Sequence, residues 1–246
     1  MFSQLPYFKV NREERHFCFL LGAEIINNMA FTNSFFKLLN SKFNLNLDPE
    51  SFEIYFEVAA LRDYWADLGD SILYSSETHE KRVNVLKAIF ADSGLNYDDL
   101  IKNQVFWTNK PFESKLWSPG RWAVNKLKEI DSSNNLLKVR WCFNAKPDFM
   151  VLSNNELLII EVKIESSEGR NDSGYNQYEI QKKIVHLMQL LIPYFKDYKA
   201  SLASLELAPK KRTNGISWHE VLQIVQDVPF TNSFSKKSLL ELKKYK

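Results

Sequence analysis

Apolar residues recur every three or four positions through most of the first half of the chain, which is the spacing of amphipathic helices. The stretch NREERHFCFLLGAEIINNMAF predicts a helix over about 12–30, and Asn11 and Glu14 stand at capping-box spacing at its start. The same kind of pattern predicts further helices over 48–68, 76–94, 97–107 and about 120–130. We therefore expect a helical N-terminal region.

The pattern changes after 131–135, where short apolar runs separated by polar residues replace the helical spacing. LLKVRWCF, PDFMVLS and ELLIIEVKI each predict a strand, and Asn154-Asn155 between the last two predicts a hairpin. The elements that follow are a helix over 175–195, a strand over 199–208 and a helix over 217–227.

This order of elements predicts an α+β fold, with a central mixed sheet flanked by helices. No proline- or glycine-rich linker separates the helical half from the strand-containing half. We therefore expect residues 1–117 to form a helical region that packs on a core at 118–246, which holds the sheet and the C-terminal helices.

Composition is that of an ordinary soluble globular protein. Of the 246 residues, 45% are hydrophobic and 25% are charged, and the formal net charge of +2 neither requires nor excludes a nucleic-acid partner. No apolar run approaches the ~18 residues of a membrane span, and the N-terminus lacks the pattern of a signal peptide. We expect a cytoplasmic protein without a membrane partner, in which Cys18 and Cys142 are buried free thiols.

Basic residues gather at two places near the C-terminus. Lys210, Lys211 and Arg212 are consecutive, and the tail SKKSLLELKKYK holds five lysines and one acid. Such clusters are either solvated surfaces or contacts to nucleic acid. We take Lys210, Lys211 and Arg212 as candidate nucleic-acid contacts.

Acidic and basic side chains meet at the end of the predicted hairpin. Side chains of a strand alternate between two faces, so Glu161 and Lys163 share a face while Val162 points the other way. The hairpin places Asp148 across from the end of the second strand, so two carboxylates converge beside one ammonium. Carboxylate oxygens, a backbone carbonyl and waters suit Mg²⁺, and a neighbouring lysine can orient or deprotonate a water. Such a site would cleave a phosphodiester.

A simpler interpretation is a salt bridge between Glu161 and Lys163 at the end of the sheet. Pro147-Asp148 one hairpin strand earlier, and the aliphatic run that leads directly to Glu161, favour the catalytic interpretation. The sequence does not show the motifs of other common catalytic or binding sites. The four histidines show no metal-ligand spacing, and the chain has no GxSxG, P-loop or GxGxxG sequence.

Pro147-Asp148, a gap of twelve residues and then Glu161-Val162-Lys163 resembles the motif of the PD-(D/E)XK nuclease superfamily, which has the restriction-endonuclease-like fold. The resemblance covers about a third of the chain. It implies a core of a helix, three antiparallel strands, a helix and a further strand, which we expect from about 118 to 208. It also implies that Asp148, Glu161 and the backbone carbonyl of Val162 bind Mg²⁺ or Mn²⁺, while Lys163 acts on the nucleophilic water.

Many members of this superfamily carry a glutamine on the helix after the third strand. Gln177, Gln181 and Gln189 are the candidates here. We favour Gln181 as a surface-facing residue of the active site, because Gln177 lies in the first turn of the predicted helix. A polar helix face without a catalytic role is the alternative.

Many members also carry a glutamate on an early helix, which completes the metal shell. Glu14, Glu24 and Glu57 compete for this role. Glu14 lies on the apolar stripe of its helix, and its alternative role is the capping box with Asn11. Glu24 can also face inward, and Glu57 is surrounded by apolar residues. The sequence leaves the choice open, and Glu14 is our first candidate.

The resemblance implies a Mg²⁺-dependent endonuclease, for which we expect DNA rather than RNA as substrate and a role in phage defence or restriction. Homodimers are frequent in this superfamily, so a homodimer is a further expectation from the resemblance. Two other hypotheses remain. The chain is a catalytically silent module of the same fold that binds nucleic acid or a partner protein, or it is an α+β interaction protein with a coincidental motif.

Overall fold

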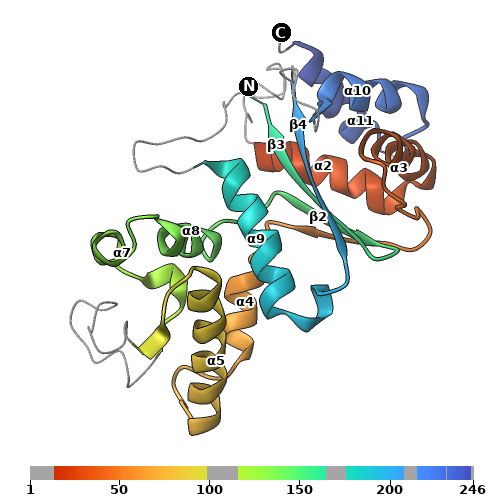
Figure 1. Ribbon diagram of the computed structural model, residues 1–246. Coiled ribbons are helices and arrows are strands. Elements are labelled where there is room, and N and C mark those ends of the chain that lie inside the picture. Colours follow the sequence, from red (N-terminus) through yellow and green to blue (C-terminus); the bar gives the residue numbers. More distant parts are fainter. Residues whose placement is uncertain (1–13, 99–115, 165–175, 208–214, 231, 245–246) are drawn as a thin grey trace. The chain divides into compact units, whose positions relative to one another are not determined.

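The computed structural model describes residues 14–98, 116–164, 176–207, 215–230 and 232–244 (Figure 1). The chain forms two compact units, each built from segments that are far apart in the sequence. The first unit contains residues 1–58, 147–168 and 198–246, and the second contains 59–146 and 169–197. This division cuts across the predicted boundary at 117, because residues on both sides of that boundary share each unit.

A mixed sheet of five strands lies in the first unit, as far as the described residues extend. The strands are β1 Glu53–Phe56, β2 Phe149–Ser153, β3 Glu156–Lys163, β4 Lys199–Glu206 and β5 Gly215–Ser217. They follow the order β1-β2-β3-β4-β5 across the sheet. The first three strands pair antiparallel, and β4 pairs parallel with both β3 and β5. The predicted α+β class with a mixed sheet is confirmed.

The predicted hairpin is formed by β2 and β3, whose last ladder pair joins Ser153 to Glu156. The turn residues Asn154 and Asn155 both have positive φ, at 48° and 60°. A two-residue turn of type I′ needs positive φ at both positions, which asparagine adopts more readily than most residues. The turn thereby fixes the register, and the register decides which side chains meet at the far end of the hairpin.

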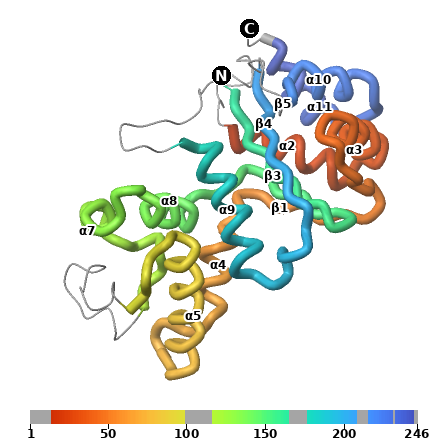
Figure 2. Tube along the Cα trace, viewed as in Figure 1, coloured from red at the N-terminus to blue at the C-terminus, as the bar shows by residue number. Residues whose placement is uncertain are grey.

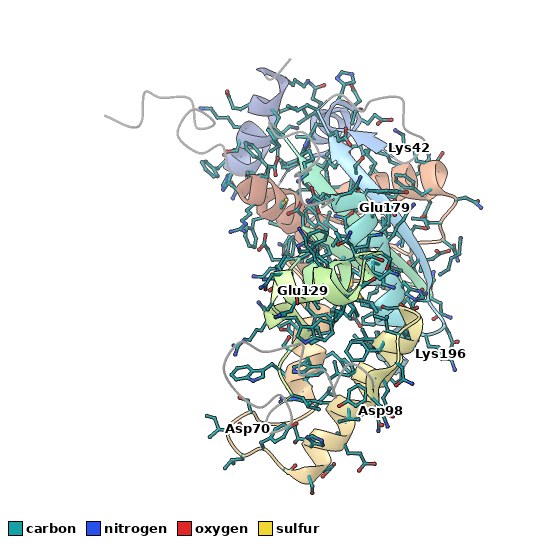
Figure 3. The ribbon with its side chains drawn as sticks, turned by 60° about the vertical axis from the view of Figure 1, so that its left-hand side comes forward. Lys42, Asp70, Asp98, Glu129, Glu179 and Lys196 are labelled. Carbon is teal, nitrogen blue, oxygen red and sulfur yellow. The ribbon has the colours of Figure 1, made fainter. Side chains whose placement is uncertain are left out.

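Helices pack against one face of this sheet in the first unit (Figure 1). They are α2 Glu14–Asn27, α3 Met29–Phe43, α10 Trp218–Asp227 and α11 Ser233–Leu240, followed by the 3₁₀ turn η5 Glu241–Lys244. Alternate residues of β3, such as Ile160 and Val162, are buried with side chains of these helices in one core. Lys42 of α3, labelled in Figure 3, donates to Glu220 of α10 at 2.6 Å.

The second unit is helical throughout its described residues (Figure 2). Its elements are α4 Ala60–Asp67, α5 Ser76–Asp92, η3 Pro119–Arg121, α7 Val124–Ile130, α8 Asn135–Cys142, α9 Gln177–Leu191 and η4 Pro193–Phe195. Helices α4, α5 and α8 all contact α9. Asp92 at the end of α5 accepts hydrogen bonds from Lys183 and His186 of α9, which ties these two helices together.

Several predicted elements are confirmed. The predicted helices over 76–94, about 120–130 and 175–195 correspond to α5, α7 and α9. The predicted helix over 217–227 is α10, which has a complete capping box between Ser217 and Glu220. Both cysteines are buried and free. No helix in the described part of the chain is long and apolar enough to cross a membrane. The predicted helix over 97–107 lies almost wholly outside the described residues.

The predicted helix over 48–68 is wrong in its first half, which forms β1. Phe52, Ile54 and Phe56 alternate with more polar neighbours, and this period of two is the pattern of a strand with one buried face. The pairing partner is β2, which lies more than ninety residues later in the chain. The helical spacing of the longer stretch predicted a helix, but this short period of two and the pairing with β2 make 53–56 a strand.

The predicted strand over 136–143 is also wrong, because these residues form α8. The apolar residues of this run form the buried face of the helix, namely Leu136, Leu137, Val139 and Cys142. The buried carboxylate of Asp131 accepts from the backbone N–H of Leu136 at 2.7 Å and so satisfies a donor of the first turn. The expectation of three antiparallel strands within 118–208 is wrong, because among the described antiparallel strands only β2 and β3 lie in that range and β1 precedes it.

Candidate active site

Acids from three adjacent strands lie in one row at the same end of the sheet. The register of β2 and β3, continued one residue before Phe149, places Asp148 opposite Glu161. The register of β1 and β2, continued one residue past Phe56, places Glu57 opposite Asp148. The N–H of Glu57 donates to the carbonyl of Asp148 at 3.2 Å, and this hydrogen bond shows that the two residues are paired. Residues directly opposite in antiparallel strands are close neighbours, so the charges of this row interact.

Asp148 is held in place by the backbone of β3. Its Oδ2 accepts a hydrogen bond from the N–H of Val162 at 2.8 Å. Burial nevertheless raises the pKa of Asp148, and the negative charges of Glu14 and Glu57 act in the same direction. The bond from Val162 and the charge of Lys163 oppose this increase but do not cancel it.

Glu161 is the more strongly perturbed of the two motif acids. It is buried, with 8% of its surface exposed. Its pKa is raised to about 7, first by burial and then by the negative charge of Asp148, while Lys163 acts in the opposite direction. Near neutral pH, the Glu161 carboxyl is therefore only partly ionised. A further positive charge next to the pair would favour the charged form of both carboxylates.

Lys163 bridges two acids from different elements. Its Nζ donates to Oε1 of Glu161 at 2.8 Å and lies 3.6 Å from Oε2 of Glu14. Burial lowers the pKa of Lys163, but the carboxylates of Glu161, Glu14 and Asp148 outweigh burial and raise it. In this arrangement, Lys163 is an ammonium that can donate hydrogen bonds and neutralise negative charge. It does not act as a base while these pairs persist.

Among the three glutamates that competed for the early-helix role, Glu14 contacts the end of β3. It is the first residue of α2, and its Oε1 accepts from the N–H of Ile164 at 3.0 Å. Glu24 is buried near the other end of α2, where it accepts from the side chain of Asn28 at 3.3 Å. Ten residues of helix separate the two glutamates by roughly 15 Å at a rise of 1.5 Å per residue. Asn11, the alternative partner of Glu14, lies outside the described residues.

Glu57 has an unusual backbone conformation. Its φ is 50°, and every other described non-glycine residue with positive φ is an asparagine. The left-handed region costs a residue with a Cβ atom about 1–2 kcal/mol. Two backbone hydrogen bonds, both of 3.2 Å, hold this conformation. The N–H of Glu57 donates to the carbonyl of Asp148, and the N–H of Val58 donates to the carbonyl of Pro147. The side chain of Glu57 pairs with Arg15, whose Nε lies 3.0 Å from Oε1.

The ligand chemistry of the row suits a hard divalent cation. Carboxylate oxygens are the protein ligands that Mg²⁺ prefers, and burial followed by the charges of neighbouring acids raises the pKa of both Asp148 and Glu161. Within the described ranges, no group of three His, Cys, Asp or Glu side chains is already arranged to hold a metal ion. Glu161 is engaged by Lys163, and Asp148 by the N–H of Val162. Ligation by the carbonyl of Val162 stays a prediction.

The remaining predicted site residues are the glutamines of α9 and the basic residues near the C-terminus. Gln181 lies on α9 in the second unit, and its role at the site stays a prediction. The expectation that Gln181 faces the surface is wrong, because only 5% of its surface is exposed. Gln177 and Gln189 lie on the same helix. Lys210, Lys211 and Arg212 lie outside the described residues.

Comparison of the chain with models of known protein families, with curated proteins and with solved structures found no match. The chemistry of the row must therefore be inferred from its own residues, contacts and charges.

Proposed function

We propose that this chain is a Mg²⁺-dependent nuclease of the PD-(D/E)XK type, which hydrolyses phosphodiester bonds of nucleic acid, with DNA favoured over RNA. The observation that carries the proposal is the convergence of motif residues. Asp148 stands opposite Glu161, and the ammonium of Lys163 lies beside Glu161. Glu14 then reaches the same ammonium from a separate helix. A structural salt bridge at a sheet end would not need this set of mutually repelling acids, of which Glu161 is buried and the others are partly exposed.

The order of elements also supports the proposal. Helix α2, the antiparallel strands β1, β2 and β3, helix α9 and the parallel strand β4 follow one another in the chain. This is the order of a helix, three antiparallel strands, a helix and a further strand that the resemblance implies. Residues 59–146 stand between β1 and β2 in the sequence, so the proposed core begins with α2 instead of near residue 118.

In this proposal, Asp148, Glu161 and the carbonyl of Val162 would hold the cation, with Glu14 at the edge of the site. When bound, Mg²⁺ supplies a water of lowered pKa and balances charge on the attacked phosphate. Lys163 donates hydrogen bonds that orient the nucleophilic water or a phosphate oxygen. Glu14 positions Lys163 through their ion pair and holds the end of β3 through the N–H of Ile164.

Single-turnover cleavage tests the role of Lys163. Labelled duplex DNA, single-stranded DNA and RNA are incubated with the wild type, Lys163→Ala and Lys163→Arg in Mg²⁺ and in EDTA. We expect each variant to lose at least about 100-fold in rate, as is typical when a positioned proton donor or acceptor is removed. Arginine keeps the charge, but its planar fork does not reproduce the geometry of an ammonium.

Lys199 provides a matched control for Lys163. Its ammonium lies 3.1 Å from the buried Glu156 at the start of β3, as that of Lys163 pairs with Glu161 near the strand's end. Lys199→Ala should cleave within about twofold of the wild type, because it removes a strand lysine outside the row. Near-wild-type cleavage by Lys163→Arg would mean that only the positive charge of Lys163 matters for cleavage. Robust cleavage by Lys163→Ala would remove this residue from the mechanism.

Thermal melting tests the metal. A divalent cation that binds only the folded state should raise the melting temperature, with a stabilisation of about 2.7 kcal/mol at a hundredfold excess over its Kd. Asp148→Ala should abolish this response to Mg²⁺ and Mn²⁺. A shift of equal size in that variant would place the cation elsewhere.

A second candidate function is a catalytically silent module of the same fold that binds nucleic acid. The observation that favours it is the pairing of Lys163 with both Glu161 and Glu14, which fills the space beside the acids with a protein cation. A silent module predicts nucleic-acid binding, no cleavage in Mg²⁺ or Mn²⁺, and no metal-dependent melting shift of the wild type. Cleavage that EDTA abolishes would exclude this candidate.

A further inference from the structure

Arg15 lies at the row of acids without being part of the sequence motif. It follows Glu14 in the first turn of α2, and its Nε forms an ion pair with Oε1 of Glu57, 3.0 Å away. Glu57 is one end of the row, and Glu161 at the other end pairs with Lys163. The two cations of the site therefore pair with acids at opposite ends of the row.

The exposure of these two cations differs. Lys163 has 14% of its side chain exposed and is in contact with two carboxylates. Arg15 has 66% of its side chain exposed, and its contact with Glu57 uses only the Nε side of the guanidinium. In the described part of the chain, the two Nη groups of Arg15 donate to no protein acceptor. Arg15 thus presents the planar N–H fork that suits the oxygens of a phosphate.

Glu57 gives this arginine a defined position. The backbone of Glu57 is held at positive φ by its own N–H bond to Asp148 and by that of Val58 to Pro147. The carboxylate that pairs with Arg15 is therefore attached to a fixed part of the sheet end and not to a loosely held strand end. An exposed ion pair by itself orders an arginine poorly, but an anchored acceptor restricts its orientation.

The charge of the site requires a cation that faces the solvent. Among the described residues, Arg15 and Lys163 pair with carboxylates of this row, Arg15 with Glu57 and Lys163 with Glu161 and Glu14. A polyanion that approaches these acids is repelled unless an accessible positive charge meets one of its phosphates first. Lys163 is largely buried among its acids, whereas Arg15 is largely exposed and can make this contact.

We propose that Arg15 binds a backbone phosphate of the nucleic acid at this site, and that Glu57 positions the arginine for that contact. This inference rests on the proposed function, because it names the residue that receives the substrate of the same site. Arg15 is then a substrate-binding residue and Glu57 a positioning residue.

The test measures binding separately from cleavage. Fluorescence anisotropy with a short labelled DNA duplex in EDTA, and again in Ca²⁺, gives the Kd over a series of KCl concentrations. Arg15→Ala should raise the Kd about tenfold and reduce the slope of log Kd against log salt by about 0.9, the value for one lost phosphate contact. Arg15→Lys should restore the slope but not the full affinity, because an ammonium lacks the fork.

Arg62 provides the matched control. It is an exposed arginine of α4 whose Nε lies 3.5 Å from Asp63, and it belongs to the second unit. Arg62→Ala should leave both the Kd and the salt slope within error of the wild type. Glu57→Gln should weaken binding but keep the salt slope, because Arg15 is still present.

Three outcomes would overturn the inference. Arg15→Ala and Arg62→Ala could have equal, small effects. Glu57→Gln and Arg15→Ala could weaken binding equally with an unchanged slope, which would make the pair purely structural. The wild type could fail to bind any nucleic acid, which would also overturn the proposed function.

Cleavage measured in parallel separates the two proposals. If the wild type cleaves in Mg²⁺ and Arg15→Ala binds and cleaves equally well, the inference fails and the nuclease proposal stands. If binding depends on Arg15 but no substrate is cleaved, the phosphate contact stands and the nuclease proposal fails. Melting temperatures of all variants establish that they are folded, so that a loss of binding is not a loss of structure.

Discussion

Replacing Glu161 by glutamine should make the metal-free protein more stable above neutral pH and remove its response to a divalent cation. Glutamine has nearly the shape of glutamate but cannot ionise. Glu161 is buried and stands opposite Asp148, so its ionised form is costly in the folded chain. The variant therefore removes a source of instability from the site while it removes a proposed metal ligand.

The magnitude follows from the pKa of Glu161, which is about 7 in the folded chain and 4.5 ordinarily. Between these values the folded state holds more protons than the unfolded state, so the free energy of unfolding falls as the pH rises. The contribution is fully present below about pH 4.5 and is lost as the pH rises through about 7. A pKa difference of this size corresponds to roughly 3 kcal/mol.

The pKa of about 7 already includes the attraction of Lys163 at 2.8 Å, which opposes the increase, so loss of this ion pair is not subtracted a second time. We expect the variant to be roughly 2–3 kcal/mol more stable than the wild type near pH 8, because glutamine avoids the cost of ionising this buried carboxyl. Near pH 4 the carboxyl is mostly protonated in both the folded and the unfolded wild type and resembles glutamine, so the two proteins should differ by less than about 0.5 kcal/mol.

Urea unfolding in EDTA at a series of pH values between these limits measures the difference directly. The pKa of His16 is lowered by burial, which gives a pH dependence of opposite sign in part of this window. His16 is present in both proteins, so its contribution cancels in the difference. Glu24→Gln is the control, because it replaces another buried glutamate by its amide and leaves Glu161 in place.

Two results would refute this reasoning. One is a Glu161→Gln protein that is less stable than the wild type near pH 8. The other is a stability difference that does not change from acidic to alkaline pH. The second half of the prediction is checked by thermal melting with Mg²⁺, which should stabilise the wild type and leave the variant unchanged. An equal shift in both proteins would remove Glu161 from the metal site.

Further predictions concern single positions. Glu57→Gly should be about 1 kcal/mol more stable than Glu57→Ala in urea unfolding, because only glycine adopts positive φ without strain; the reverse order would contradict the left-handed backbone. Asn155→Gly should raise the unfolding free energy by about 0.5 kcal/mol, since glycine suits the second position of a type I′ turn; a decrease would argue against that turn. Gln181→Ala should lower the free energy of unfolding by about 1–3 kcal/mol, because the amide is buried. The variant should also slow single-turnover cleavage at temperatures where it is folded, and unchanged cleavage would make Gln181 purely structural.

The sequence by itself determined the elements whose signals are local. The hairpin of β2 and β3 follows from two apolar runs around Asn154-Asn155, whose positive φ the turn requires. Helix α10 follows from its capping box, and α9 from its apolar spacing before Pro193. The approach of Asp148 to Glu161 and of Lys163 to Glu161 is a consequence of hairpin register and strand alternation, so it too could be predicted.

Only the tertiary structure decided the elements whose partners are distant in the chain. β1 is a strand because β2 offers hydrogen bonds to it, and its period of two is too short by itself to separate it from the helix that begins at Ala60. The run over 136–143 is apolar enough for either a strand or a helix, and the side chain of Asp131 starts the helix. In both places the intrinsic preference is weak, so packing and pairing decide.

The composition of the site shows the same division. The motif acids are close in sequence and were predicted, but the choice among Glu14, Glu24 and Glu57 depends on where α2 and β1 meet the sheet. Glu14 reaches the end of β3 because α2 begins there, and Glu24 on the same helix is a long way along its axis. Glu57 and Arg15 meet only because β1 pairs with β2 and ends opposite Asp148. Side chains from segments so far apart come together through the packing of the whole unit, and no local spacing encodes their contact.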